Sequence, residues 1–215
     1  MPNKSVTVID YGVGNILSIC RAFKSLGGEV NVTSDPQEIL SSDRILLPGV
    51  GAFGLAMDKL LTLNLVEPLR TFGESGKPFL GICLGMQLLM NNSEEFGFNK
   101  GLGLISGKNI KIPDQTVNGD LLKRPQIGWN QIHPNTDKSK WEGTLLEDHK
   151  AHESLYFVHS YMAIPQNLKD RLAFCSYGGH EVTAAISSDN IIGFQFHPEK
   201  SGEVGLKILN HFLSL

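Results

Sequence analysis

The sequence contains few cysteines and no long apolar run. Its three cysteines, Cys20, Cys83 and Cys175, are widely spaced and form neither a disulfide framework nor a C-x-x-C metal pair. No window approaches the roughly 18 apolar residues that a helix needs to span a bilayer. The first residues, MPNKSVTVIDYG, lack the apolar stretch and cleavage site of a signal peptide. We therefore expect a cytoplasmic protein with reduced thiols and no membrane partner.

The chain also lacks an excess of charge of either sign. Its 19 Lys and Arg residues against 22 Asp and Glu residues give a net charge of −3, so nucleic acid is not an expected partner. No internal repeat, low-complexity tract or linker-like change of composition divides the sequence. At 215 residues, the chain can bury a sizeable core as one unit. We therefore predict a single domain spanning residues 1–215.

Strand and helix patterns alternate through the first 95 residues. Short apolar runs typical of buried strands lie at residues 5–10, 29–34, 43–51 and 78–83. Helical spacing of apolar residues lies between them, at residues 14–28, 34–40, 52–72 and 84–95, with an expected break before Pro68. The later residues are rich in strand patterns, and the chain ends in a helix for which Ser201 is the expected N-cap. This order predicts an α/β fold with a doubly wound, mostly parallel central sheet, flanking helices and a β-rich C-terminal half.

One glycine-rich turn resembles a nucleotide-binding motif only in part. In VIDYGVGNI, residues 8–16, a predicted strand is followed by Gly12 and Gly14. Leu17 stands where the dinucleotide fingerprint needs its third glycine. We therefore interpret this segment as a tight turn and expect no nucleotide cofactor.

Two of the cysteines fit a packed core. Cys20 lies on the apolar face of the predicted helix 14–28, and Cys175 lies in an alternating strand pattern. A free cysteine usually behaves as a small hydrophobic residue, so we expect both side chains to be structural.

Cys83 differs from these two in its setting. It lies in KPFLGICLGMQLLM, residues 77–90, between Gly81 and Gly85, where a predicted strand turns into a predicted helix. Small residues on both sides permit the strained elbow that presents a nucleophile at the exposed carboxyl edge of a sheet. A helix N-terminus there favours the thiolate, and the backbone N–H of Leu84 would point where an oxyanion forms. We therefore predict that Cys83 is a nucleophile.

The base for such a nucleophile is expected at His197. The segment GFQFHPEKS, residues 193–201, ends an apolar strand at His197, because Pro198 cannot continue a sheet ladder. Glu199 lies two residues beyond the histidine and can reach the imidazole from the same turn. The spacing predicts a triad in which Cys83, His197 and Glu199 serve as nucleophile, base and orienting carboxylate.

A second glycine-rich turn, LLPGVGAFG at residues 46–54, ends another strand on the same predicted edge. Its glycines allow a backbone N–H, that of Val50 or Gly51, to turn towards a reacting carbonyl. Together with the N–H of Leu84, it would complete an oxyanion hole. Taken alone, the turn fits an ordinary strand-to-helix connection equally well.

The segments GICLGMQLL, PGVG and GFQFHPEKS together resemble the triad-type, or class I, glutamine amidotransferases. Within that family, VIDYGVGNI, PQIGWN at residues 125–130 and YFVHSY at residues 156–161 are similar to the glutaminase subunits of imidazole glycerol phosphate synthases. The resemblance covers essentially the full chain, in order. It departs at Gln126, where the family commonly has a histidine, and this departure keeps open a paralogous subunit that feeds ammonia to another amidation pathway.

The resemblance implies hydrolysis of the side-chain amide of L-glutamine to L-glutamate and ammonia. Cys83 would attack the amide, His197 would transfer the proton, and Glu199 would orient the histidine. Val50, Gly51 and Leu84 are expected at the oxyanion. Gly51, Gln87 and the HSY segment at residues 159–161, especially Ser160, are expected at the amino-acid end of the substrate.

The resemblance also implies a partner. Family members pass the ammonia to a (βα)8-barrel cyclase subunit, HisF, in a heterodimer that makes imidazole glycerol phosphate in histidine biosynthesis. We expect Lys200 and Asn15 at this interface, and neither a metal nor an organic cofactor is implied. Two alternatives from other classes remain: a γ-glutamyl hydrolase-like cysteine hydrolase on a similar elbow, and a non-catalytic partner-binding module that kept the fold.

Overall fold

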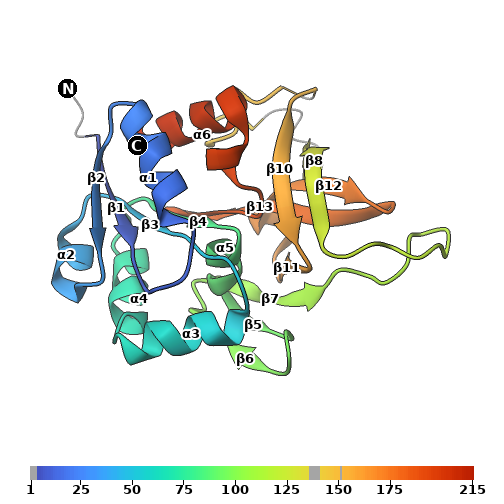
Figure 1. Cartoon of the computed structure of the whole chain (residues 1–215), viewed down its shortest axis with the longest axis horizontal. Coiled ribbons are helices and arrows are strands. Elements are labelled where there is room, and N and C mark those ends of the chain that lie inside the picture. The colour runs from blue at the N-terminus through green and yellow to red at the C-terminus, as the bar shows by residue number, and fades with distance from the viewer. Residues whose placement is uncertain (1–3, 136–140, 151) are drawn as a thin grey trace.

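An eight-stranded sheet with helices on both faces forms the centre of the computed structural model, which describes residues 4–135, 141–150 and 152–215 (Figure 1). In spatial order its strands are β2 (Glu29–Thr33), β1 (Ser5–Ile9), β3 (Ile45–Leu47), β4 (Phe79–Ile82), β14 (Ile191–Phe194), β13 (His180–Ser188), β12 (Arg171–Tyr177) and β9 (His133–Pro134). The strands from β2 to β14 pair in parallel, and the strands from β14 to β9 pair antiparallel. The predicted doubly wound α/β architecture is confirmed.

The helices divide between the two faces of this sheet. On one face lie α1 (Ile16–Ser25) and α6 (Gly202–Ser214), which meet through the rings of Phe23 and Phe212, 6.4 Å apart. The other face carries α2 (Pro36–Ser41), α3 (Phe53–Thr62), α4 (Val66–Glu74) and α5 (Leu84–Leu88). Separate buried clusters of apolar side chains fill the two layers, which is the packing that a sheet covered on both faces requires. No helix in the described ranges is long and apolar enough to cross a membrane.

Two smaller sheets extend the C-terminal half. One consists of β11 (Tyr161–Pro165), β7 (Ile105–Lys111), β5 (Met90–Ser93) and β6 (Asn99–Lys100), and the other pairs β10 (Ser154–His159) with β8 (Gln126–Gln131). Two short 3-10 helices, η1 (Leu168–Asp170) and η2 (Pro198–Lys200), complete the regular structure of the described residues. The β8–β10 pair stands beside the carboxyl ends of the parallel strands (Figure 1).

Local sequence signals account for several helix boundaries. The carboxylate of Asp35 accepts the N–H groups of Gln37 and Glu38, and Pro36 takes the first position of α2. The break expected before Pro68 is confirmed, because α3 ends at Thr62 and α4 begins at Val66.

Two expectations about helix ends need correction. The predicted helix 84–95 is wrong beyond Leu88, because residues Met90–Ser93 form β5. Their carbonyls find partners outside a helix: Met90 and Asn91 accept from the N–H groups of Gly103 and Gly101. Ser201 precedes α6 as predicted but does not cap it with its side chain.

Candidate active site

A cavity of about 290 Å³ opens at the carboxyl ends of β3 and β4. The structure brings six of the predicted site residues together around it: Val50, Gly51, Cys83, Leu84, Gln87 and Ser160. His159 and Tyr161, from the HSY segment assigned to the substrate, also line the wall, and residues that sequence reasoning did not assign to the site complete it: Glu95, Pro125 and Val158. The location agrees with the rule that open α/β sheets bind ligands beyond the carboxyl ends of their strands.

Cys83 occupies a strained turn between β4 and α5. Its φ of +56° lies in the left-handed region, which costs a residue with a side chain about 1–3 kcal/mol. The glycines on both sides make the turn possible by allowing close backbone contacts. A Cβ at Gly85 would lie 1.9 Å from the carbonyl oxygen of Leu47, and one at Gly81 would lie 2.7 Å from that of Gly85. The geometry is therefore that of a nucleophile elbow.

The expectation that Cys83 lies on an exposed edge is wrong. Only 6% of the residue is exposed, because β10 covers the turn. The sulfur lies 3.9 Å from the carbonyl oxygen of Val158 in that strand. The thiol is therefore reached through the cavity rather than from open solvent. Cys20 and Cys175 are buried in the core, as predicted, and burial raises the pKa of Cys175 to about 11.

His197 and Glu199 form a buried pair beside Cys83. Nδ1 of His197 lies 2.8 Å from Oε1 of Glu199, so this nitrogen carries the proton that the carboxylate accepts. Nε2 has no hydrogen-bond partner within the described residues. Burial alone would lower the pKa of His197, but the hydrogen bond to the Glu199 carboxylate and the proximity of Cys83 outweigh it and raise the pKa to about 9. The arrangement therefore favours the charged, imidazolium form of His197.

Ser201 supports this pair. Its hydroxyl donates to the carbonyl oxygen of His197 at 2.7 Å and accepts the N–H of Tyr156 at 3.0 Å. The N–H of His197 also donates to the carbonyl of Tyr156. The turn that carries the histidine is thus tied to β10, which explains why the hydroxyl is not available to cap α6.

The predicted oxyanion hole is closed in this structure. The N–H of Leu84 donates to the carbonyl oxygen of Gly49 at 3.3 Å, so it is not free for a substrate oxygen. The neighbouring Pro48 carbonyl accepts from the hydroxyl of Tyr11 at 2.8 Å. Gly51 has a φ of +107°, a conformation that favours glycine. The turn containing Val50 and Gly51 must change its peptide orientation before the hole can form.

Two polar side chains of the cavity wall, those of Gln87 and Glu95, have hydrogen-bond partners of their own. Nε2 of Gln87 donates to the carbonyl of Tyr161 at 3.0 Å and to Oε1 of Gln195 at 2.9 Å, so only its oxygen remains to face a substrate. Glu95 accepts the N–H of Phe53, at the start of α3, at 2.6 Å. Glu95 lay inside a segment predicted as helix, and no local pattern distinguishes it. Gln195 lies two residues before His197 in the segment GFQFHPEKS, just beyond the end of β14.

His159 is a neutral, buried component of the wall. Burial, as the largest cause, lowers its pKa to about 4, although the hydrogen bond of Nδ1 to the Tyr161 carbonyl acts in the opposite direction. An unfolded chain binds this proton near pH 6.5. Between pH 6.5 and 4, His159 is therefore protonated in the unfolded chain but neutral in the folded chain, so the free energy of unfolding decreases as the pH falls.

We expect the free energy of unfolding to drop by about 2 kcal/mol between pH 7 and 5 on account of His159. His197 contributes in a different window: its raised pKa gives stability that is complete below pH 6.5 and lost as the pH rises through about 9. Urea unfolding of the wild type and of His159→Gln at both pH values measures the difference. If the free energy of unfolding dropped equally in the two proteins between pH 7 and 5, the contribution assigned to His159 would be wrong. Burial also lowers the pKa of His149, but this contribution is present in both proteins and cancels in the comparison.

The remaining sequence assignments lie outside the cavity. Gln126 is buried and donates to the sulfur of Cys175 at 3.5 Å, so this departure from the family pattern does not contact Cys83. The ammonium of Lys200 lies 5.9 Å from the ring centre of Tyr156. Asn15 caps α1 through the N–H of Ser18. The described part of the chain contains no cluster of three or more His, Cys, Asp or Glu side chains that could hold a metal ion.

Comparison with known families and sequences gives consistent matches. The family described as "Glutamine amidotransferase class-I" matches residues 7–214. The chain is 51% identical over 211 residues to "Imidazole glycerol phosphate synthase subunit HisH 1" of Legionella pneumophila (strain Lens), covering 98% of this chain and 99% of that protein. It is 44% identical over 208 residues to the HisH subunit of Syntrophotalea carbinolica, covering 96% and 98%.

Solved structures with the same fold are more distant in sequence. The structure titled "PurLQS from Thermotoga maritima" matches with a TM-score of 0.70 at 18% identity, covering 98% of this chain and 97% of that chain. A crystal structure described as a glutamine amidotransferase matches with a TM-score of 0.69 at 14% identity, covering 98% and 99%. These matches establish the fold.

Proposed function

The chain belongs to the class I glutamine amidotransferase family, and we propose that it is the glutaminase subunit of imidazole glycerol phosphate synthase in histidine biosynthesis. It hydrolyses L-glutamine to L-glutamate and ammonia. The observation that carries this function is Cys83 on a strained elbow beside the His197–Glu199 pair, on a wall of a cavity large enough for a small amino acid. The reduced thiols and the biosynthetic role support a cytoplasmic location, and we treat residues 1–215 as one domain.

The triad divides the reaction into two steps. The thiolate of Cys83 attacks the carboxamide carbon of glutamine, and His197 donates its Nε2 proton to the departing ammonia. This leaves a γ-glutamyl thioester and a neutral histidine. His197 then takes a proton from water, which attacks the thioester and releases glutamate. Glu199 holds the imidazole through Nδ1 and stabilises its charged form in both steps.

The oxyanion and the amino-acid end of the substrate are held by groups that line the cavity. The N–H groups of Leu84 and of Val50 or Gly51 stabilise the oxyanion after the turn has changed orientation. The oxygen of Gln87 and the carboxylate of Glu95 provide acceptors for the α-ammonium group. Ser160 and the backbone of Gly51 line the same space and can bind the α-carboxylate.

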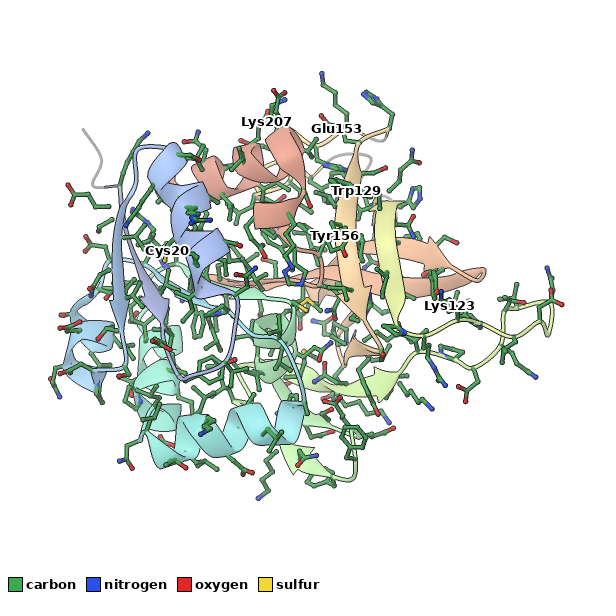
Figure 2. All side chains as sticks on the ribbon, in the orientation of Figure 1. Cys20, Lys123, Trp129, Glu153, Tyr156 and Lys207 are labelled. Carbon is green, nitrogen blue, oxygen red and sulfur yellow. The ribbon has the colours of Figure 1, made fainter. Side chains whose placement is uncertain are left out.

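The partner is a (βα)8-barrel cyclase, HisF, which receives the ammonia in a heterodimer. The relatives named above are subunits of a synthase, which supports a second subunit. Near the triad, the outer face of β8 exposes Ile127 and Trp129, each more than half exposed. Figure 2 shows Trp129 and Tyr156 on neighbouring strands, and their ring centres are 5.9 Å apart. With Lys200 beside Tyr156, this apolar and basic surface is the proposed contact, and Asn15 is assigned to its periphery.

Replacing Glu199 with Gln is expected to reduce kcat for glutamine hydrolysis by about a hundredfold or more, with little change in KM. The amide no longer stabilises the imidazolium, so the pKa of His197 falls from its raised value. Steady-state glutamate release by the complex with the barrel measures the effect. Glu147→Gln is the matched control, because Glu147 pairs with His211 on the surface. A fully active Glu199→Gln variant would refute the role of Glu199. The variant His197→Ala should lose nearly as much turnover as a variant without Cys83.

A further inference from the structure

A chain of side-chain amides runs from the backbone of β11 to the sulfur of Cys83. Nε2 of Gln87 donates to the carbonyl oxygen of Tyr161 at 3.0 Å and to Oε1 of Gln195 at 2.9 Å. Nε2 of Gln195 in turn lies 3.7 Å from the sulfur of Cys83, within hydrogen-bond range for sulfur. Gln195 is completely buried and Gln87 nearly so, which removes competing water from the chain.

The direction of this chain is fixed at its far end. The carbonyl of Tyr161 can only accept, so Gln87 must present its NH₂ group to it. The same NH₂ group also points at Gln195, which must therefore present its oxygen to Gln87. A rotated Gln195 amide would set two donors against each other. The NH₂ group of Gln195 is left facing Cys83, and the sulfur receives a donor.

A hydrogen-bond donor at the sulfur offsets an unfavourable neighbour. The carbonyl oxygen of Val158, 3.9 Å away, can accept from a thiol but repels a thiolate. The titratable groups that interact with the sulfur from other elements are His197 and Tyr11. The hydroxyl of Tyr11 donates its hydrogen bond to the Pro48 carbonyl, so it supplies none to the sulfur. Gln195 therefore supplies a side-chain hydrogen-bond donor at the sulfur of Cys83, and the charged form of His197 beside it can stabilise a thiolate by charge.

We propose that Gln195 is a further catalytic residue, which donates a hydrogen bond to the sulfur of Cys83 and favours the thiolate, and that Gln87 is the positioning residue that orients it. The inference rests on the proposed function in taking Cys83 as the nucleophile. It gives Gln87 two roles, since the residue that faces the amino-acid end of the substrate also orders the donor at the reacting sulfur. Substrate recognition and nucleophile activation then share one buried network.

The test is the pH dependence of Cys83 alkylation by iodoacetamide in the full-length chain, followed by mass spectrometry of the Cys83 peptide. In Gln195→Met, a side chain of similar length without a donor, the rate at pH 7 should fall about tenfold and the profile should move up by about one pH unit. Gln87→Met should move it in the same direction, because Gln195 is then free to rotate. No glutamine is turned over, so the outcome is independent of the proposed reaction.

Gln126→Met is the matched control. Gln126 is also a buried glutamine that donates to a cysteine sulfur, but that sulfur belongs to Cys175. If the two glutamines are only structural, Gln195→Met and Gln126→Met should both lower the thermal stability, and the pH profile of Cys83 alkylation should be the same in the two variants. A shifted profile in Gln195→Met together with a wild-type profile in Gln126→Met supports the proposal. A wild-type profile in folded Gln195→Met overturns it, and if that variant fails to fold, a wild-type profile in Gln87→Met overturns it instead.

Discussion

Replacing Cys83 with Ala is expected to abolish glutamine hydrolysis while leaving the fold intact. The substitution removes the nucleophile, and loss of a covalent nucleophile usually costs several powers of ten in turnover. Alanine keeps the Cβ and the backbone of the elbow, and the sulfur lies on a cavity wall, so its removal enlarges a space that already exists. Glutamate release in the presence of the partner, with circular dichroism as the check on folding, measures both effects.

The other two cysteines supply the control for this experiment. Cys20 and Cys175 are buried in the core and away from the cavity. Their alanine variants should change stability by about 1 kcal/mol and leave turnover close to that of the wild type. If Cys83→Ala kept more than about a hundredth of the activity, the nucleophile assignment would be wrong.

The isolated chain is expected to hydrolyse glutamine very slowly. The proposed barrel partner, together with the nucleotide that it converts to imidazole glycerol phosphate, is expected to raise turnover by about a hundredfold or more, mainly through kcat. The reason is the hydrogen bond between the N–H of Leu84 and the carbonyl of Gly49, which occupies an oxyanion donor at rest. Loss of one such donor typically costs about a hundredfold to a thousandfold in kcat.

Three mixtures test this prediction: the chain alone, the chain with the barrel, and the chain with the barrel and nucleotide. Steady-state glutamate release should rise along the series at nearly constant KM. Trp129→Ala, on the proposed contact surface, should weaken the stimulation without changing the rate of the isolated chain. Equal rates in all three mixtures would identify an autonomous hydrolase and contradict the subunit function.

The parts of the site that could be predicted from the sequence are those encoded within a few consecutive residues. Gly81 and Gly85 identify the elbow because no larger side chain fits beside the neighbouring backbone. His197 and Glu199 share one turn, so their contact follows from a spacing of two residues and the strand end at Pro198. The alternation of apolar patterns similarly predicts the succession of strands and helices along the chain as far as β4.

The parts that could not be predicted depend on contacts between distant segments. Burial of Cys83 depends on β10, about 75 residues further along the chain. The helix predicted through residue 95 ends early because the backbone around Met90 pairs with residues 99–111 instead. The segment's long-range partners therefore override its local helical pattern, and this override brings Glu95 to the cavity.

The hydrogen bond between Leu84 and Gly49 also has a consequence for the affinity between this chain and the proposed barrel partner. An oxyanion and the Gly49 carbonyl compete for one N–H, and we propose that the partner favours the conformation in which that N–H is released. Coupling between two binding events is reciprocal. If docking strengthens the binding of an oxyanion-bearing adduct on Cys83 by about a hundredfold, that adduct must tighten the complex by the same factor, or about 2.7 kcal/mol. The complex should therefore hold together most firmly during the chemical step and loosen once glutamate has formed.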